Sequence, residues 1–500
     1  MEKFDELKAR LAEISDLVRA AAVLGWDQQT YMPPGGTAAR SEQLATLSKL
    51  AHQHFISDEI GDLLEASAQE TEGMDYGSDE ASLVRVTRRD YQKARRVPSE
   101  LVAELARVTT LATETWTQAR AQANFSLFAP HLERIVALEI RLAEALGYDE
   151  RIYDALLEQY EPEMKTAQVE AIFAEIKPQL VQLAREIAEH QDRVDDAVLH
   201  RSYDEQAQWD FGVEIIKSFG FDFQRGRQDR SAHPFTTGFS PDDVRITTRF
   251  ESDFLSPALF GTFHECGHAL YEQGVSPALA RTPLDGGTSL GLHESQSRLW
   301  ENLVGRSRGF WTFFYPRLQE RFPRQLADTD LESFYKAVNR VQPSLIRVEA
   351  DEVTYNLHIM LRFDLENALL EGKLRVKELP QAWNAKVEEY LGLTPPDDTQ
   401  GVLQDIHWSG GMLGYFPTYA LGNLISVQLW ERIRQDISDL PAQIESGHFE
   451  ALRAWLREKV HQHGRKFTPV ELLQRVSGSA LQAEPYLTYI QSKFSDIYDL

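Results

Sequence analysis

The segment His264-Glu265-Cys266-Gly267-His268 combines two imidazoles and a carboxylate at a spacing that can hold a metal ion. Residues four positions apart in an α-helix lie on one face, so His264 and His268 can reach the same ion. Glu265 then lies close enough to polarise a water molecule at that ion. A solvated helix face is the alternative for so short a pattern, but apolar residues flank it. The pattern predicts a catalytic zinc-type site.

A third protein ligand is expected, because catalytic zinc usually binds three and keeps a fourth position for water. Residues 271–275, directly after the motif, contain no histidine. Glu294 and Glu301 follow on a helix expected over 290–306, and glycines and prolines before it let the chain reverse. Spacing favours Glu294, and Glu301 is its competitor.

Composition limits the class of protein. A chain of 500 residues is longer than a single hydrophobic core usually supports, so we expect subdomains that share a cleft. The net charge of −25 argues against a nucleic-acid partner, which requires a basic surface. No segment approaches the ~20 apolar residues of a membrane span, and the charged start predicts no signal peptide. Cys266 is the only cysteine, so no intrachain disulfide can form. We expect a cytoplasmic protein.

Apolar periodicity predicts a mainly α fold, with a helical lobe over 1–217 and a metal-bearing lobe over 218–500. Alternating residues at 231–238 and 243–250 predict a small sheet next to the metal helix. An edge strand there can pair with a peptide, and a structural hairpin is the alternative. A loop is expected at 24–36. Helices are expected at 1–23, 37–54, 58–70, 79–95, 99–122, 126–146, 150–159, 166–191, 203–217, 290–306, 308–321, 330–340, 347–371, 376–390, 418–436, 446–462 and 469–475.

Two further segments carry candidate site residues. The glycine-rich run 401–419 contains His407, Tyr415 and Tyr419, and its glycines let the backbone approach a ligand closely. A surface turn is the alternative for this run. Arg347 lies four residues before Asp351, so a helix-surface ion pair is the default expectation for it.

The order of these motifs resembles the carboxypeptidase Taq family of metallocarboxypeptidases along the whole chain. The resemblance implies a large two-lobed helical fold with a deep substrate groove, related to neurolysin and angiotensin-converting enzyme. The matching motifs are Trp26 to Pro34, His233-Pro234-Phe235, Asp243-x-Arg245-x-Thr247, His264 to His268, His293-Glu294-Ser295-Gln296, Ile346-Arg347-x-x-Ala350-Asp351, Gly401-x-x-Gln404-Asp405-x-His407-Trp408 and Gly414-Tyr415-Phe416-Pro417-Thr418-Tyr419.

The resemblance also implies a reaction and its cofactor. It implies zinc, with cobalt as a substitute, and Glu294 as the third ligand beside His264 and His268. It implies a homodimer that removes single C-terminal residues, with broad preference, from peptides with a free C-terminus. In this hypothesis Glu265 is the general base, and Tyr415 and His407 donate to the oxyanion.

A carboxypeptidase must also bind the terminal carboxylate of its substrate, and arginine suits that task. Arg347 is the best candidate, with Arg245 and Arg249 as rivals. His233, Gln404 and Tyr419 complete the expected substrate-binding set. The alternative functions are a dipeptidyl carboxypeptidase or oligoendopeptidase of the same fold, or a non-catalytic helical scaffold.

Overall fold

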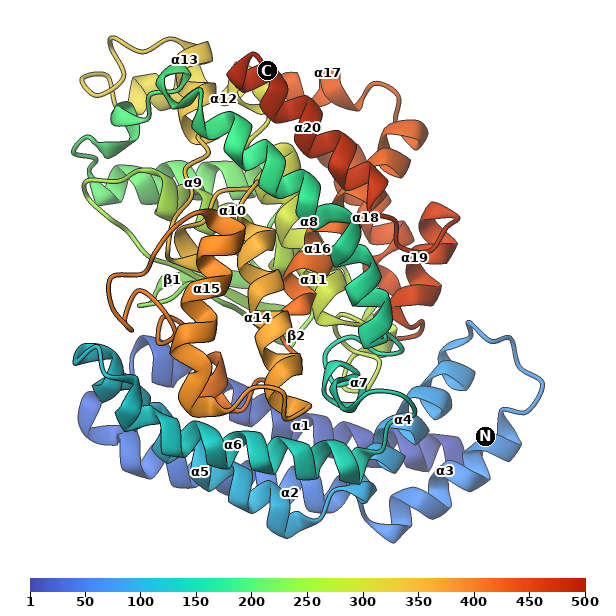
Figure 1. Cartoon of the computed structure of the whole chain (residues 1–500). Coiled ribbons are helices and arrows are strands. Elements are labelled where there is room, and N and C mark those ends of the chain that lie inside the picture. The colour runs from blue at the N-terminus through green and yellow to red at the C-terminus, as the bar shows by residue number, and fades with distance from the viewer. The chain divides into compact units, whose positions relative to one another are not determined.

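Helices form most of the chain, and a three-stranded sheet lies beside one of them (Figure 1). The computed structural model describes residues 1–500 apart from the side chain of Pro34. Within this described part, no helix is both long enough and apolar enough to cross a bilayer. The mainly α fold with a small sheet next to the metal helix is confirmed.

The chain divides into two compact units, each built from segments that are far apart in the sequence. Unit 1 comprises Met1–Arg95, Asp196–Val338 and Leu429–Ala480. Unit 2 comprises Arg96–Asp195, Asn339–Gln428 and Leu481–Leu500. The lobe boundary expected near residue 217 lies inside a helix of unit 1. Local periodicity carries no information about which distant segments associate.

Unit 1 holds the N-terminal helices and the metal helix. Leu7 and Leu11 of its first helix pack with Leu64 and Leu83 in a buried apolar cluster. Its helices are α1 (Glu2–Thr30), α2 (Thr37–Phe55), α3 (Asp58–Glu70), α4 (Asp79–Arg96, ending at the unit boundary), α9 (Glu205–Phe219), α10 (Ser256–Gly274), α11 (Leu290–Arg298), the π-helix η5 (Leu299–Val304), α12 (Arg308–Arg321), α13 (Leu331–Val338), α17 (Leu440–Glu445), α18 (Glu450–Lys459) and α19 (Pro469–Ser477), with the 3₁₀ turns η1 (Pro34–Gly36), η3 (Ala197–His200), η4 (Pro277–Leu279) and η9 (His461–His463).

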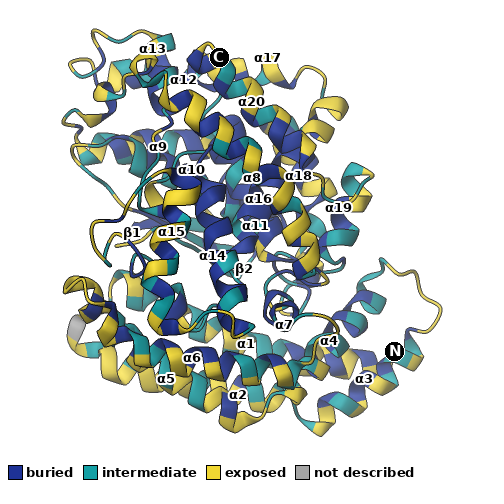
Figure 2. Ribbon diagram, in the orientation of Figure 1, coloured by how far each residue is buried: buried dark blue, intermediate teal, exposed yellow. Residues whose placement is uncertain are grey.

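Unit 2 is helical, and α5 and α6 pack against each other within it (Figure 1). Its helix α14 is buried along nearly its whole length (Figure 2). The helices are α5 (Ser99–Ala121), α6 (Phe125–Leu146), α7 (Ile152–Leu157), α8 (Thr166–Ala188), α14 (Tyr355–Leu370), α15 (Leu379–Leu391), α16 (Pro417–Asp436, in unit 2 up to Gln428) and α20 (Glu484–Tyr498), with the 3₁₀ turns η2 (Gln191–Arg193), η6 (Arg347–Glu349), η7 (Val376–Glu378) and η8 (His407–Gly410).

The sheet consists of β1 (Gly226–Arg230), β2 (Thr236–Ser240) and β3 (Asp243–Thr248) in the order β1-β3-β2. Strand β3 pairs antiparallel with β2 and parallel with β1, and it packs on α10. Strand β2 therefore lies at an edge, beside the metal helix. The sequence predicts the β2–β3 hairpin but misses β1, whose residues are mostly polar.

Several helix boundaries differ from the prediction, most clearly those of α1 and α14. Helix α1 continues to Thr30, so residues 24–30, expected in a loop, form its last turns. The single helix expected over 347–371 is broken, because the Asp351 carboxylate accepts the backbone N–H groups of Val353 and Thr354 at 2.9 Å each. Such local side-chain bonds compete with helical pairing, and α14 starts only at Tyr355.

Candidate metal centre

Helix α10 carries the metal motif and packs closely against α11 at Gly267. A Cβ atom on Gly267 would lie 2.6 Å from the backbone oxygen of Gln296 and 2.6 Å from the Cα of Ser297. Only glycine permits this approach, because any side chain would push the two backbones apart. The contact brings Glu294 of α11 to the face of α10 that holds His264 and His268.

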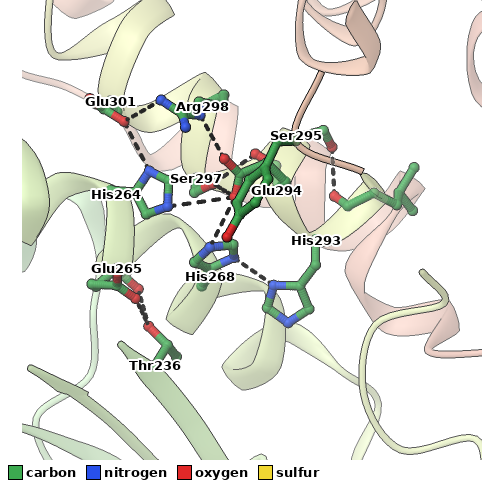
Figure 3. Close-up of polar contacts among 12 residues, drawn as sticks. Thr236, His264, Glu265, His268, His293, Glu294, Ser295, Ser297, Arg298 and Glu301 are labelled. Atoms are coloured by element: carbon green, nitrogen blue, oxygen red, sulfur yellow. Dashed lines mark hydrogen bonds and ion pairs between the residues drawn. The ribbon is translucent and has the colours of Figure 1, made fainter. Parts of the chain in front are cut away.

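The three candidate ligands point at one centre (Figure 3). The Oε2 atom of Glu294 lies 3.6 Å from Nε2 of His264 and 3.5 Å from Nε2 of His268. Zinc bonds of about 2.1 Å in a tetrahedral site separate their donor atoms by about 3.4 Å. The residues therefore fit a single ion of that size, with donors typical of zinc.

Hydrogen bonds hold each imidazole at its other nitrogen. Nδ1 of His264 lies 2.9 Å from Oε2 of Glu301, and Nδ1 of His268 lies 2.6 Å from Nδ1 of His293. Nε2 of His293 lies 2.7 Å from Oε1 of Glu272. If the Nε2 lone pairs face a metal, Nδ1–H of His268 donates to His293, whose Nε2–H donates to Glu272. Such outer partners fix the tautomer and orientation of metal-binding histidines.

The geometry distinguishes the two competing carboxylates. Glu301 contacts the outer nitrogen of His264, so it lies behind the ring, whereas Glu294 lies in front of it. Arg298 lies between them, with Nε 2.7 Å from Oε1 of Glu294 and Nη1 3.4 Å from Oε2 of Glu301. Burial opposes ionisation, but Arg298 and His264 together lower the pKa of Glu294 below its ordinary value and that of Glu301 to about 2. Both groups are therefore carboxylates at neutral pH.

Glu265 is buried beside this cluster, and the edge strand β2 holds its carboxylate. Oγ1 of Thr236 donates to Oε2 of Glu265 at 2.7 Å (Figure 3). Burial raises the pKa of Glu265 above its ordinary value, while His264 and the Thr236 hydrogen bond partly offset this effect. A carboxylate with a raised pKa is suited to proton transfer near neutral pH.

Unit 2 brings Arg347 together with Asp405, not with Asp351 as the helix-surface alternative supposes. Nη2 of Arg347 lies 2.8 Å from Oδ1 of Asp405, and Nη1 donates to the Tyr355 hydroxyl at 3.0 Å. Arg362 approaches the same carboxylate, with Nε 2.7 Å from Oδ2. Burial opposes ionisation of Asp405, but the two guanidiniums outweigh it and lower the pKa far below its ordinary value.

His407, Tyr415, Tyr419 and Gln404 lie around this ion-pair cluster in unit 2. Nε2 of His407 lies 3.4 Å from the Tyr419 hydroxyl, and the His407 and Tyr415 ring centroids are 5.3 Å apart. The side-chain oxygen Oε1 of Gln404 accepts the backbone N–H of Arg347 at 3.0 Å, so Gln404 holds the arginine in place. Burial, aided by the nearby guanidiniums and opposed by Asp405, lowers the pKa of His407 to about 4. His407 is thus neutral at pH 7.

The remaining predicted substrate-binding residues lie in unit 1. His233 is exposed, in the segment before β2. Arg245 is engaged within the unit, because Nε and Nη2 both bind Asp243 at 2.9 Å and its guanidinium lies 4.4 Å above the Trp26 ring centroid. Arg249 pairs with Glu251 at 2.7 Å. Their contacts with substrate stay predictions.

Comparison with known proteins identifies the family of this chain. A model of the carboxypeptidase Taq (M32) metallopeptidase family matches residues 6–494. The chain belongs to that family. It is 44% identical to thermostable carboxypeptidase 1 of Thermus thermophilus, over 97% of each protein, and 40% identical to thermostable carboxypeptidase 1 of Pyrococcus furiosus, over 99% of this chain and 98% of that protein. The crystal structure of M32 carboxypeptidase from Deinococcus radiodurans R1 superimposes with a TM-score of 0.97 at 40% identity, with 100% of each chain covered.

As a member of the carboxypeptidase Taq family, the chain is a metallocarboxypeptidase. The family resemblance predicted from its motifs is confirmed. Sequence reasoning gave no role to Thr236, Arg298 or His293, although all three contact the candidate ligands or Glu265. The position of His293 next to Glu294 was a usable signal, but its hydrogen bond to His268 depends on how α10 and α11 pack.

Proposed function

We propose that this metallocarboxypeptidase is a zinc enzyme in which His264, His268 and Glu294 hold the metal. The supporting observation is that both Nε2 atoms lie within 3.6 Å of one Glu294 oxygen while both Nδ1 atoms are held from behind. Two imidazoles and a carboxylate are a common catalytic donor set for zinc, and cobalt can occupy the same donors. Metal content of the purified enzyme, and reactivation of chelator-treated enzyme by zinc or cobalt, test this assignment.

Glu265 is the proposed general base. The bound metal supplies a Lewis acid that acidifies a water molecule and polarises the scissile carbonyl. Thr236 donates to Oε2 of Glu265, which leaves Oε1 to accept the proton of the attacking water. The same carboxyl group then returns the proton to the leaving amine, so Glu265 serves both halves of the hydrolysis.

Arg347 is the proposed anchor for the C-terminal carboxylate of the peptide. Two guanidiniums, Arg347 and Arg362, share the single carboxylate of Asp405, so these three groups together carry one positive charge, +2 − 1. Burial opposes the charge on Arg347, but Asp405 and the neighbouring tyrosines raise its pKa well above its ordinary value. The guanidinium is therefore permanently charged and held in a fixed orientation, which suits carboxylate recognition.

Tyr415 and His407 are the proposed donors to the oxyanion. The two rings lie together, and the low pKa of His407 leaves a neutral imidazole that can donate one N–H without a competing charge. A donor of this kind typically contributes about 10²-fold or more to kcat. Tyr419 and His233 are proposed to contact the peptide. Gln404, which the sequence assigned to substrate binding, is proposed to act by holding Arg347.

The decisive experiment compares peptides that differ only at the C-terminus. Wild-type enzyme should release one residue at a time from an N-terminally blocked peptide with a free carboxylate, and a chelator should abolish release. The amidated peptide should be cut far more slowly, and Arg347→Ala should remove most of this preference. Mass spectrometry distinguishes this from dipeptide release or internal cuts. An unchanged ratio of the two rates in Arg347→Ala would exclude Arg347 as the anchor.

Assembly, partners and location form the remaining part of the proposal. The family resemblance supports a homodimer, which light scattering should detect as twice the chain mass. The expected partners are peptides with a free C-terminus and broad side-chain character, and the net charge of −25 disfavours nucleic acid. The single cysteine supports a cytoplasmic location.

A further inference from the structure

Glu366 of α14 is a fully buried carboxylate that accepts three hydrogen bonds inside unit 2. Its Oε1 atom accepts the indole N–H of Trp408 at 2.7 Å. Its Oε2 atom accepts the hydroxyl of Tyr153 at 2.7 Å and the backbone N–H of Gly414 at 3.1 Å. Both oxygens are therefore occupied by donors.

Two of the three donors lie just inside the two ends of the segment from His407 to Tyr415, which forms a turn. Trp408 directly follows His407, and Gly414 directly precedes Tyr415. Bonds inside the segment, such as Met412 N–H to the His407 carbonyl at 3.0 Å, close the turn on itself. Glu366 therefore links the two arms of the turn, one at Trp408 and the other at Gly414, to the buried helix α14. One carboxylate holds both ends of the turn.

The backbone at Gly414 leaves little freedom for the turn to adopt another position. Gly414 has a φ of +89°, and a Cβ atom there would lie 2.8 Å from the Leu156 carbonyl carbon of α7. Glycine supplies both the left-handed conformation and the close approach. In this arrangement the Gly414 N–H points to Glu366, so the hydrogen bond and the packing favour the same backbone position.

We propose that Glu366 is a positioning residue that holds His407 and Tyr415 in the orientation peptide hydrolysis requires. This role rests on the proposed function, in which these two side chains donate to the oxyanion. In this proposal Glu366 is not itself an oxyanion donor but bonds the turn through Trp408 and Gly414. It acts through the turn, because a misplacement of about 1 Å in a donor can cost about 10² in rate.

A carboxylate is the group that this position requires. An amide at residue 366 would offer one acceptor oxygen and one NH₂ group. With the NH₂ toward Trp408 the indole N–H loses its acceptor, and with the NH₂ toward Gly414 the backbone N–H loses its acceptor. The Tyr153 hydroxyl can reverse and accept, but neither N–H can. Every orientation of a glutamine therefore breaks one arm of the turn.

The cost of burial indicates that the three donors are needed. Burial raises the pKa of Glu366 to about 7, although the Tyr153 and Trp408 hydrogen bonds lower it. An isolated buried carboxylate would be more costly still, so its donors compensate the loss of water. An apolar residue of similar size would avoid this cost but would leave the Gly414 N–H and the Trp408 indole unpaired.

The test compares Glu366→Gln with Tyr153→Phe. Tyr153→Phe removes a hydrogen bond from the same carboxylate but none from the turn, so it is the matched control. Glu366→Gln should lower kcat at least about 10-fold with KM nearly unchanged, because the affected donors act in the transition state. Tyr153→Phe should stay within about twofold of wild-type kcat. The indole N–H resonance of Trp408, assigned with Trp408→Phe, should shift in Glu366→Gln only.

Three outcomes decide the matter. Equal kcat values for Glu366→Gln and Tyr153→Phe would overturn the positioning role, whether or not the indole resonance moves. A loss in Glu366→Gln that multiplies fully with the loss in Tyr415→Phe would overturn it too, since residues acting through one another are not additive. If Glu366→Gln does not fold, Trp408→Phe cuts one arm from the other side and should lower kcat several-fold, and full activity there would overturn the role. Unchanged kcat in Tyr415→Phe would instead refute the proposed oxyanion donor.

Discussion

Replacing Gly267 by alanine should weaken metal binding without altering any of the three proposed ligands. The new Cβ would lie 2.6 Å from the Gln296 oxygen, against about 3.5 Å for an ordinary contact. The backbones of α10 and α11 must therefore separate by about 0.9 Å at this contact, and Glu294 lies on α11 two residues before Gln296. Metal–ligand distances tolerate only about 0.2 Å, so Glu294 would leave its bonding position.

The effect of an added methyl group on folding stability is the sum of two opposing contributions. Alanine in a helix is more favourable than glycine by up to about 1 kcal/mol, whereas overpacking costs about 1–3 kcal/mol. Gly261→Ala is the matched control on α10, because its Cβ would meet only Pro234 Cγ at 3.8 Å. We expect Gly261→Ala to keep or raise the Tm, and Gly267→Ala to lose at least about 10-fold in zinc affinity.

Competition with a chromophoric chelator at fixed pH measures the zinc Kd of both variants, and circular dichroism measures the Tm. The comparison removes the contribution of helix propensity, which both substitutions share. Zinc affinity of Gly267→Ala equal to that of Gly261→Ala would refute the inference that the contact of α10 with α11 positions Glu294.

Two further predictions concern buried side chains that take no direct part in the proposed reaction. His293→Ala should lower zinc affinity about 10–100-fold, because His268 loses the acceptor of its Nδ1–H. His293→Asn should restore part of this affinity, because its side-chain oxygen can accept the same N–H. Equal zinc affinities in the two variants would contradict the assigned tautomer of His268. Glu139 of α6 is buried, and burial together with the nearby Glu366 raises its pKa to about 8. Because its folded-state pKa lies above the ordinary value of 4.5, the wild-type protein loses stability as pH rises from about 4.5 to about 8, by at most about 5 kcal/mol. The Tm of Glu139→Gln should therefore gain on that of wild type across this pH range, and a gain independent of pH would contradict the buried-carboxyl explanation.

Local pattern predicted most helices and the metal motif. The bounds expected for α3 and α12 match the structure, since amphipathic periodicity and chain breakers depend on nearby residues only. His264 and His268 share a face for the same reason. The prediction failed where a side chain redirected the backbone, as Asp351 does before α14, and where a strand such as β1 carries polar residues.

The partners of the site residues depended on contacts between distant segments. The sequence placed Glu294 and Glu301 as rivals, and only the packing of α11 on α10 at Gly267 puts one in front of His264 and the other behind it. The default pairing of Arg347 with Asp351 is likewise replaced by Asp405, 58 residues away.

The sequence by itself determined the metal motif, because a helix repeats every 3.6 residues and places the two imidazoles together wherever it lies. The reaction class came from the order of the motifs along the chain, through their resemblance to the family. Only the tertiary structure decided which residues hold the site groups by hydrogen bonds. Thr236 bonds Glu265, His293 bonds His268, and Glu366 bonds the turn from His407 to Tyr415. Such hydrogen bonds form between elements whose approach is set by packing, and no local spacing encodes that approach.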